Sequence, residues 1–347
     1  MKTVAPAACR RSACATSLCI ALLLACSCLA ATRPHYGGTL RVEIRETMET
    51  ADPPQTGNLG ALTSGFAVVQ WEGGRHAVYS ADPAAAGGRP FLDSVEIQMG
   101  RALHDQSIAL SLGKADVVEF DPNEPQRAGS APKIWSSAPV RVLALVFGPR
   151  MENARVREAL ALAVDRNSIH NVMLQRQGEI SGALLPQWLS GDAFLFPVAT
   201  DVAKARALVS GVPPAVRTFT LGVADPAFRR IADRIALNAR DAGLAVSAAP
   251  SSAAADVRLV EVRIASSDPA AALAGVASSL GLAAPPRTDS PEALYTAERT
   301  LLEGFRVVPL FHLPDVYGVG PRVKGGPGIT PLGEWRFENL WLEGARP

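Results

Sequence analysis

Alternation of apolar and polar residues predicts several half-buried strands along the chain. In the first of them Leu40, Val42 and Ile44 alternate with polar residues, and paired glycines and paired prolines punctuate the two ends. A phase slip at Val260 in a later strand predicts a β-bulge there. The same signal predicts strands over residues 66–71, 95–99, 116–120, 217–224, 244–249, 256–265 and 305–312.

Residues 140–148, "VRVLALVFG", form a nearly continuous apolar run that ends at a glycine. Such a run is typical of a strand covered on both faces. Directly after it, "NARVREALALAVDRNSI" (153–169) has a helical period. Its apolar stripe comprises Val156, Ala159, Leu160, Ala163 and Val164, and the pattern turns Arg155, Arg157 and Glu158 away from that stripe.

Asp165 comes where this stripe ends and a second one begins, at Ile169, Val172 and Met173. A carboxylate at such a junction is typical of the N-cap of a second helix. We therefore expect Asp165 to cap a helix, with Arg166 beside it, and we do not expect this pair to act as a catalytic acid or base.

Further helices are predicted near residues 101–113, 225–243 and 291–304. The segment 217–249 then reads strand, helix, strand, a βαβ unit whose crossover is expected to be right-handed. Strands that alternate with helices in this way predict an α/β fold. We find no internal repeats.

The composition is that of a globular protein with one large or two medium domains. The chain has 347 residues, of which 48% are hydrophobic and 19% are charged. Its formal charge of +1 includes Lys2, Arg10 and Arg11, so the chain beyond residue 25 is slightly acidic. A basic field for nucleic acid is therefore not expected.

The first 30 residues have the layout of a secretory signal peptide: basic residues, an apolar run over 18–24, and then small residues. "LLAC" (23–26) resembles a bacterial lipobox, which would make 1–25 a lipoprotein signal and Cys26 the acylated residue. Ordinary cleavage near Ala30 or Ala31, with Cys26 discarded, is the alternative. Both interpretations predict export, either to the periplasm or to a lipid anchor at the outer face of a bacterial membrane.

All five cysteines lie before residue 29, so no disulfide, thiolate metal site or cysteine nucleophile is expected in the rest of the chain. The motifs G-x-S-x-G, H-E-x-x-H and G-x-x-x-x-G-K-[ST] do not occur, and the five histidines are scattered without metal-ligand spacing. We therefore predict no enzyme activity, no cofactor and no metal site.

Six blocks occur in the order found in the family 5 extracytoplasmic solute-binding proteins of ABC transporters, and the chain resembles that family over most of residues 36–325. "NARVREALALAVDRNSI" resembles the family's most recognisable signature. The others are "GGTLRVEI…ADP", "GRPFLDSVEIQ" with "SLGKADVVEF", "DVAKARALV", "IADRIALNARDAGLAV" and "YTAERTLLEGFRVVPLFH…PRVKG".

This resemblance implies a two-lobed α/β fold of the type II periplasmic-binding-protein class, with a central cleft. Lobe 1 would combine residues 36–148 with 313–347, and lobe 2 would be the continuous segment 149–312, with a hinge near Gly148 and Leu313. Family members are usually much longer. The gap here falls between Pro54 and about Phe66, so the chain would lack most of the family's extra subdomain.

The resemblance also implies a function. The protein would bind a small solute, oligopeptide-like or other, between two lobes and deliver it as a monomer to the permease subunits of an ABC importer, without catalysis. The alternative is a degenerate binding protein that acts as a sensor or interaction module at the membrane surface. A third hypothesis, an exported hydrolase, lacks a recognisable Ser or Asp constellation.

Candidate ligand-binding residues follow from where the resemblance places the cleft. Trp188 could stack on a ligand, and the alternative is a role in an exposed loop or in the core. The acidic candidates could bind a ligand, and the alternative is that they are solvated or cap a helix. Ala265 stands about where peptide binders often hold the ligand's amine with a carboxylate, and Gly148 where they often have Asn, which weakens a peptide assignment. The candidates are Thr47, Met48 and Glu49 after the first strand, Trp188 in "LLPQW", and Ser266, Ser267 and Asp268.

Overall fold

A computed structural model describes residues 33–47, 65–120, 132–192, 195, 198–249, 251–287 and 290–344. The chain divides into two compact units, Met1–His35 and Tyr36–Pro347, and all of the described strands and helices lie in the second. The predicted signal segment with Cys26, and the candidates Met48 and Glu49, lie outside the described residues. Within the described ranges, no helix is long and apolar enough to cross a membrane.

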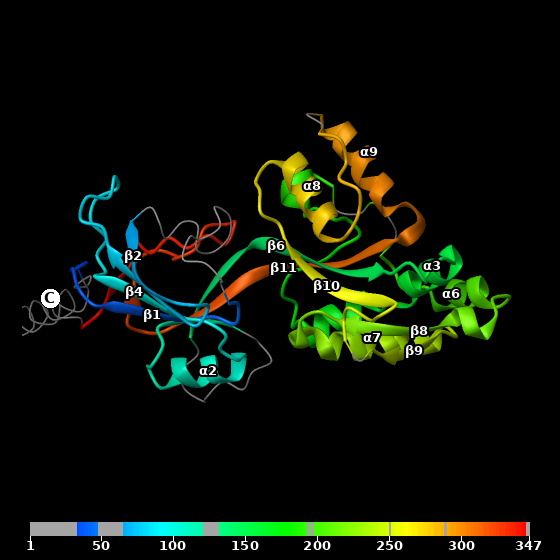
Figure 1. Cartoon of the computed structure of the whole chain (residues 1–347), viewed down its shortest axis with the longest axis horizontal. Helices are drawn as coiled ribbons and strands as arrows, with labels where there is room; N and C mark the ends of the chain where they lie inside the picture. The colour runs from blue at the N-terminus through cyan, green and yellow to red at the C-terminus, as the bar shows by residue number, and fades with distance from the viewer. Residues whose placement is uncertain are drawn as a thin grey trace, which may run out of the picture. The chain divides into compact units, whose positions relative to one another are not determined.

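The second unit is built on an eleven-stranded mixed sheet with the order β2-β3-β4-β1-β5-β11-β6-β10-β8-β9, and β7 pairs with β11. Figure 1 shows how the strands and helices are arranged. The strands are β1 (Thr39–Glu43), β2 (Phe66–Glu72), β3 (His76–Ala81), β4 (Ser94–Gln98), β5 (Val117–Glu119), β6 (Lys133–Phe147), β7 (Glu179–Ile180), β8 (Thr218–Val223), β9 (Ala245–Ala248), β10 (Val257–Arg263) and β11 (Val307–Val319). A second, two-stranded sheet consists of β12 (Val323–Lys324) and β13 (Trp341–Leu342).

The helices follow the predicted α/β pattern. The βαβ unit of β8, α7 and β9 is confirmed, because β8 and β9 pair in parallel on either side of α7 in the chain. The α-helices are α2 (Leu103–Ser111), α3 (Ala154–Ala163), α4 (Arg166–Ser168), α5 (Gln187–Ser190), α6 (Val202–Val209), α7 (Arg229–Asp241), α8 (Pro269–Ser279) and α9 (Pro291–Leu302). The shorter turns are the π-helix η2 (Ile169–Met173) and the 3₁₀ helices η3 (Pro214–Arg217), η4 (Pro226–Phe228) and η5 (Glu303–Phe305).

Strands β6 and β11 are antiparallel partners over most of their length and connect the two halves of the sheet (Figure 1). The sequence predicted only one half of each strand. The other halves contain Pro139 and Pro314, which lie opposite each other in the ladder, and the register shifts around Pro314. Because proline donates no N–H to a ladder, its presence in a sequence argues against a strand. Pairing between β6 and β11 nevertheless extends both strands past their prolines.

Four hydrophobic clusters of described residues pack against this sheet, the smallest between α2 and β5. One lies between the sheet and α3, α6 and α7, and another lies on the opposite face under α8 and α9. Residues 142–147 of β6 alternate between these two clusters, so the predicted strand with both faces covered is confirmed. The third cluster joins β1, β3 and β4 to the segment that carries Trp335 and Phe337.

Strand β10 corrects one prediction. It pairs with β6 and with β8 in unbroken register, so the bulge expected at Val260 is wrong. Val260 packs against the cluster under α8 and α9, while Leu259 belongs to the cluster on the other face. Both faces of β10 are covered. Val260, which breaks the apolar–polar alternation, is therefore in an apolar environment without a bulge.

Helix α3 confirms the predicted stripe, since Val156, Ala159, Leu160 and Ala163 are all buried. The prediction that Arg157 faces away is wrong. Its guanidinium is buried and donates hydrogen bonds to the carbonyls of Met151, Glu152 and Gly304. An arginine whose donors reach backbone carbonyls can be buried, and no helical period signals such partners.

The junction after α3 is a structural corner. The Asp165 carboxylate accepts hydrogen bonds from the backbone N–H and hydroxyl of Ser168, which lower the Asp165 pKa, so the predicted N-cap is confirmed. The Arg166 guanidinium is buried and donates to the carbonyls of Ala161 and Pro309, and burial lowers its pKa to about 10. Val172 is 71% exposed, so the second stripe is wrong there. The turn that follows is a π-helix, whose period differs from the assumed one.

Candidate functional site

The carboxyl ends of two sets of parallel strands meet where β6 and β11 connect the halves of the sheet. Strands β4, β1 and β5 run parallel to one another, and so do β10, β8 and β9. Strands β5 and β10 each pair antiparallel with β11 or β6, which are themselves antiparallel, so the two sets point toward each other. In open α/β sheets, ligands bind outside the carboxyl ends of the strands.

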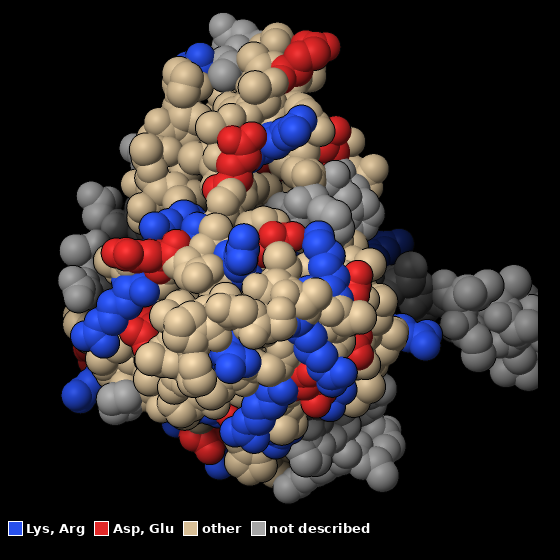
Figure 2. Space-filling view, turned by 90° about the vertical axis from the view of Figure 1, so that its right-hand side faces the viewer, with Lys and Arg blue, Asp and Glu red and all other residues tan. Residues whose placement is uncertain are grey.

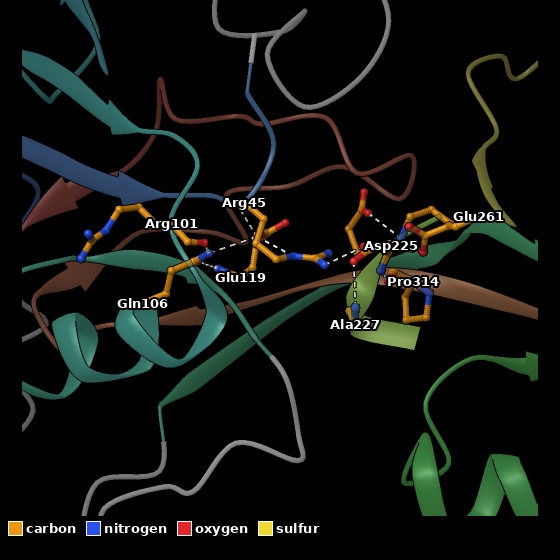
Figure 3. Close-up of polar contacts among 10 residues, drawn as sticks. Arg45, Arg101, Gln106, Glu119, Asp225, Ala227, Glu261 and Pro314 are labelled. Carbon is orange, nitrogen blue, oxygen red and sulfur yellow. Dashed lines mark hydrogen bonds and ion pairs between the residues drawn. The ribbon is translucent and has the colours of Figure 1, made fainter. Parts of the chain in front are cut away.

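Arg45 follows the end of β1 and reaches from one set to the other (Figure 3). Its backbone N–H and its Nε both donate to Oε2 of Glu119, at 2.7 and 3.1 Å. Its Nη1 donates to Oδ2 of Asp225, in the loop after β8, at 2.8 Å. Burial lowers the Arg45 pKa, but the carboxylates of Glu119 and Asp225 outweigh this effect and raise it.

Glu119 is held in place by a glutamine on α2. The fully buried amide of Gln106 donates through Nε2 to Oε2 of Glu119 at 3.1 Å, and its Oε1 accepts from the Glu119 backbone N–H at 2.9 Å. Figure 3 shows Gln106 and Glu119 on the side of Arg45 away from Asp225. Gln106 therefore helps to orient the carboxylate that accepts from Arg45.

A second group of charges lies on the strands that connect the two halves. Arg141 on β6 contacts Glu261 on β10 through Nη1 at 2.8 Å and Asp315 on β11 through Nε at 3.1 Å. Arg263 contacts the other oxygen of Asp315 at 2.6 Å. Burial raises the Glu261 pKa, although Arg141 and Arg45 oppose that shift. We call Arg45, Glu119, Asp225, Arg141, Glu261, Arg263 and Asp315 the charge cluster.

The two opposed prolines lie beside this cluster, and each carbonyl receives a side-chain donor. Arg141 Nη2 donates to the carbonyl of Pro314 at 2.6 Å, and Trp188 Nε1 donates to the carbonyl of Pro139 at 2.9 Å. Neither proline has an N–H to give to the ladder. At this pair of prolines in the β6–β11 ladder, the carbonyls therefore accept hydrogen bonds from the side chains of Arg141 and Trp188.

The residues predicted from the sequence lie in several places. Thr47 is exposed, two residues after Arg45. Trp188 is on α5, 42% exposed, with its indole N–H bound to Pro139. Ser266, Ser267 and Asp268 follow β10, and Asp268 caps α8 through the backbone N–H of Ala271. Of the predicted residues in the described ranges, Thr47 and Ser266 to Asp268 follow β1 and β10, and Trp188 contacts Pro139 beside the charge cluster.

Sequence reasoning missed Arg45, Glu119 and Asp225. All three lie at or just after the ends of strands that the sequence did predict, so a charged residue at a strand's carboxyl end was the available signal. The signal could not be used without the strand directions, because only the carboxyl ends of parallel strands converge on one place.

Among the described residues, no group of three or more His, Cys, Asp or Glu side chains could hold a metal ion. The acids of the charge cluster instead have arginine partners. The arrangement is suited to noncovalent recognition of polar groups.

A sequence model described as bacterial extracellular solute-binding proteins, family 5 Middle, matches residues 29–281. This is well over half of the chain. The chain belongs to this family. A search of the curated proteins by sequence gave no match.

Solved structures of other proteins share the fold. The ABC transporter substrate-binding protein CtaP of Listeria monocytogenes is 17% identical with a TM-score of 0.65; the match covers 80% of this chain and 66% of CtaP. A dipeptide-binding protein from Pseudoalteromonas, in complex with Met-Leu, gives 14% and 0.65, with 80% and 64% covered. NikA of Staphylococcus aureus, in complex with Ni(L-His)₂, also gives 14% and 0.65, with 80% and 68% covered.

The predicted fold class is confirmed. These relatives are two-lobed binding proteins, and this chain has the same mixed α/β fold in a shorter form that spans about two thirds of their length. The position of the gap, which the sequence places between Pro54 and about Phe66, includes residues outside the described ranges and stays a prediction.

Proposed function

We propose that this protein is the extracytoplasmic solute-binding component of an ABC importer, and that it binds a small solute between two lobes. The observation that carries the proposal is the meeting of two opposed sets of strand ends at the charge cluster, in a chain of this family. Capture and release by hinge motion require no covalent chemistry.

The hinge follows from the strands that join the two sets. The family resemblance places the crossings near Gly148 and Leu313. We place the crossing of β6 earlier, at Pro139 opposite Pro314, because the ladder lacks proline N–H groups there and the register shifts on either side of Pro314. The lobes would then be about residues 36–138 with 315–347, and 140–313.

The ligand would be a small polar or charged solute. The charge cluster offers guanidinium donors and carboxylate acceptors at the strand ends, and both are groups that recognise polar ligands. Proteins that share the fold have been solved with Met-Leu, with mannopinic acid and with Ni(L-His)₂, so the same scaffold accepts several ligand chemistries. All of the residues predicted from the sequence remain candidates: Thr47, Met48 and Glu49 follow β1, Ser266, Ser267 and Asp268 follow β10, and Trp188 contacts Pro139 beside the charge cluster.

A thermal-shift screen against short peptides, opines, sugars and metal chelates tests this proposal. A ligand at 100 times its dissociation constant adds about 2.7 kcal/mol to the free energy of unfolding and raises the melting temperature. We expect one class to raise it, and the rise to shrink in a Glu261→Gln variant at a fixed ligand concentration. A screen in which every class leaves the melting temperature unchanged would count against solute binding.

Export and anchoring complete the proposal. Residues 1–30 would direct the chain across the membrane, and Cys26 would carry a lipid anchor if the lipobox resemblance holds. A multi-chain anchor would hold the protein on membranes. Membrane partitioning that a Cys26→Ser variant leaves unchanged would exclude this anchor. We further propose that the protein is a monomer that delivers its ligand to permease subunits.

The alternative function is a sensor or interaction module at the membrane surface. It is favoured by the short match, which covers 66% of CtaP. The gap predicted between Pro54 and about Phe66 would leave less protein around the ligand region. Crosslinking in cells separates the two: permease subunits as neighbours support import, whereas a sensor protein as the neighbour supports the alternative.

The outer face carrying α3, α6 and α7 has interspersed basic and acidic side chains and thus no single-sign field for nucleic acid (Figure 2).

A further inference from the structure

The ion pair between Arg45 and Asp225 joins parts of the chain 180 residues apart. Arg45 belongs to the strand set of β1 and β5, and Asp225 to the loop that links β8 to η4 (Figure 3). Among the described residues, other contacts also cross between the halves: Arg263 contacts Asp315 and the Leu332 carbonyl, and Arg141 contacts Asp315. The ion pair between Arg45 and Asp225 differs from the contacts of Asp315 because neither of its partners lies on a crossing strand. The Arg45–Asp225 contact can therefore break without disturbing the crossing strands.

Each member of this pair is fixed by its own half of the molecule. The Arg45 backbone N–H and Nε are bound to Glu119, which Gln106 holds, so Nη1 is the arm that reaches across. Asp225 uses Oδ1 to accept from the backbone N–H of Ala227 and Oδ2 to meet Arg45. Because both side chains are already positioned, the bridge forms with little further loss of side-chain entropy.

We propose that Arg45 and Asp225 form a latch that favours the closed arrangement of the two lobes before any ligand is bound. This inference rests on the proposed function, because it assigns a regulatory role to the same site. The side chains are 26% and 32% exposed, so water and ions can reach the pair when it opens. A partly exposed pair of this kind shifts an equilibrium by up to about fivefold, which is enough to bias a hinge and still permit release.

The latch has a consequence for ligand affinity. A ligand that binds only the closed state has an apparent dissociation constant that rises as the closed fraction falls. Breaking the pair should therefore weaken binding by up to about fivefold through the smaller closed fraction alone. The loss of any contact that Arg45 or Asp225 makes with the ligand would add to this effect.

The latch can be tested by electron–electron resonance between nitroxide labels at Ser111→Cys on α2 and Ser210→Cys after α6, both exposed positions. The full chain is used with its five cysteines, all before residue 29, changed to serine. Without ligand, Asp225→Asn and Arg45→Gln should each raise the ratio of long-distance to short-distance populations by up to about fivefold relative to the parent. Asn keeps the side-chain oxygen that accepts from Ala227, so this variant removes charge without removing the cap.

Two controls make the result specific. Glu96→Gln neutralises a carboxylate on β4 that is also 32% exposed and pairs with His76 on the neighbouring strand β3, within the half that carries Arg45, so it should leave the distances unchanged. The double variant Arg45→Gln with Asp225→Asn should shift the population no further than Arg45→Gln alone, because Arg45→Gln already removes the ion pair to Asp225. Raising the salt concentration from about 0.05 to about 1 M should lengthen the parent's distances and leave those of Asp225→Asn unchanged.

Identical distance distributions for the parent and Asp225→Asn would overturn the latch. This outcome is separate from the ligand screen. A parent protein that gains thermal stability from a ligand, with distances insensitive to Asp225, would leave solute binding intact and remove only the latch. If Asp225→Asn changes the distances but no ligand class raises the melting temperature, the latch stands and the proposed function is contradicted.

Discussion

Two buried ionisable side chains hold the segment that precedes α5. Glu298 on α9 accepts hydrogen bonds from the backbone N–H groups of Leu184 and Leu185, and His312 on β11 lies 3.2 Å from the Leu184 carbonyl. Burial raises the Glu298 pKa to about 7, and burial lowers the His312 pKa to about 4. Both shifts disfavour the charged form, but they act on stability with opposite signs.

Glu298→Gln should expose the effect of His312. Because its pKa is raised, Glu298 contributes less to the free energy of unfolding as pH rises from 4.5 to 7. Because its pKa is lowered, His312 contributes more to the free energy of unfolding as pH rises from 4 to 6.5. In the parent the two therefore largely cancel between pH 4.5 and 6.5. In Glu298→Gln the free energy of unfolding should rise over pH 4–6.5 by about 3 kcal/mol relative to the parent.

Urea denaturation at a series of pH values measures this difference. The reciprocal variant His312→Gln lacks the rising His312 contribution, so its own free energy of unfolding should fall between pH 4.5 and 7. Its difference from the parent should fall between pH 4 and 6.5. Curves for Glu298→Gln and the parent that run parallel from pH 4 to 7 would show that Glu298 is not buried as a titrating group.

At the scale of elements, the turn into β7 depends on a glycine. Gly178 has φ of +73°, and a Cβ at this position would collide with the carbonyl oxygen of His312 on β11. The His170 ring also binds the Gly178 carbonyl. Only a residue without a Cβ allows this backbone approach, which pairs β7 with β11.

Gly178→Ala should destabilise the protein by about 2–5 kcal/mol, since the strain of a positive φ adds to a clash with a backbone atom. Gly113→Ala is the matched control. Gly113 has φ of +66°, and a Cβ there would meet open space, so its cost should be about 1–2 kcal/mol. Chemical denaturation of both variants checks the difference, and equal destabilisation would mean that the turn before β7 relaxes away from His312.

At the scale of the whole second unit, β6 and β11 link its hydrophobic clusters. The N-terminal part of β6 contributes Trp135 to the cluster around Trp335, and its C-terminal part contributes Leu143 and Leu145 to the cluster under α3 and α7. Because β6 and β11 both run through the two halves, the two halves should unfold together, even if the hinge between the halves bends.

Trp335→Ala tests this coupling. Trp335 is fully buried between Tyr317 and Phe337, so its removal should cost about 3–5 kcal/mol. Calorimetry should still show one transition at a lower temperature. Trp188→Ala, at a half-exposed position with one hydrogen bond, should cost about 1 kcal/mol. Two separated transitions in Trp335→Ala would show that the halves fold independently.

The sequence by itself determined features that depend on residues close together in the chain. The alternation in β1, the stripe of α3 and the cap at Asp165 are local patterns, and the βαβ unit of β8, α7 and β9 follows from periods and turns within about 30 residues. Even the family signature is a local pattern, which is why it identified the fold and not the ligand site.

Only the tertiary structure decided which of these elements face each other. The meeting of Arg45 with Asp225 depends on the direction of two strand sets and on pairing between β6 and β11, and neither leaves a period in the sequence. Likewise, Arg157 and Arg166 are polar in any local pattern, yet carbonyls up to 147 residues away make their burial stable. The reason is physical: hydrogen bonds and ion pairs between distant segments compensate the burial of charge, and their partners are chosen by the fold.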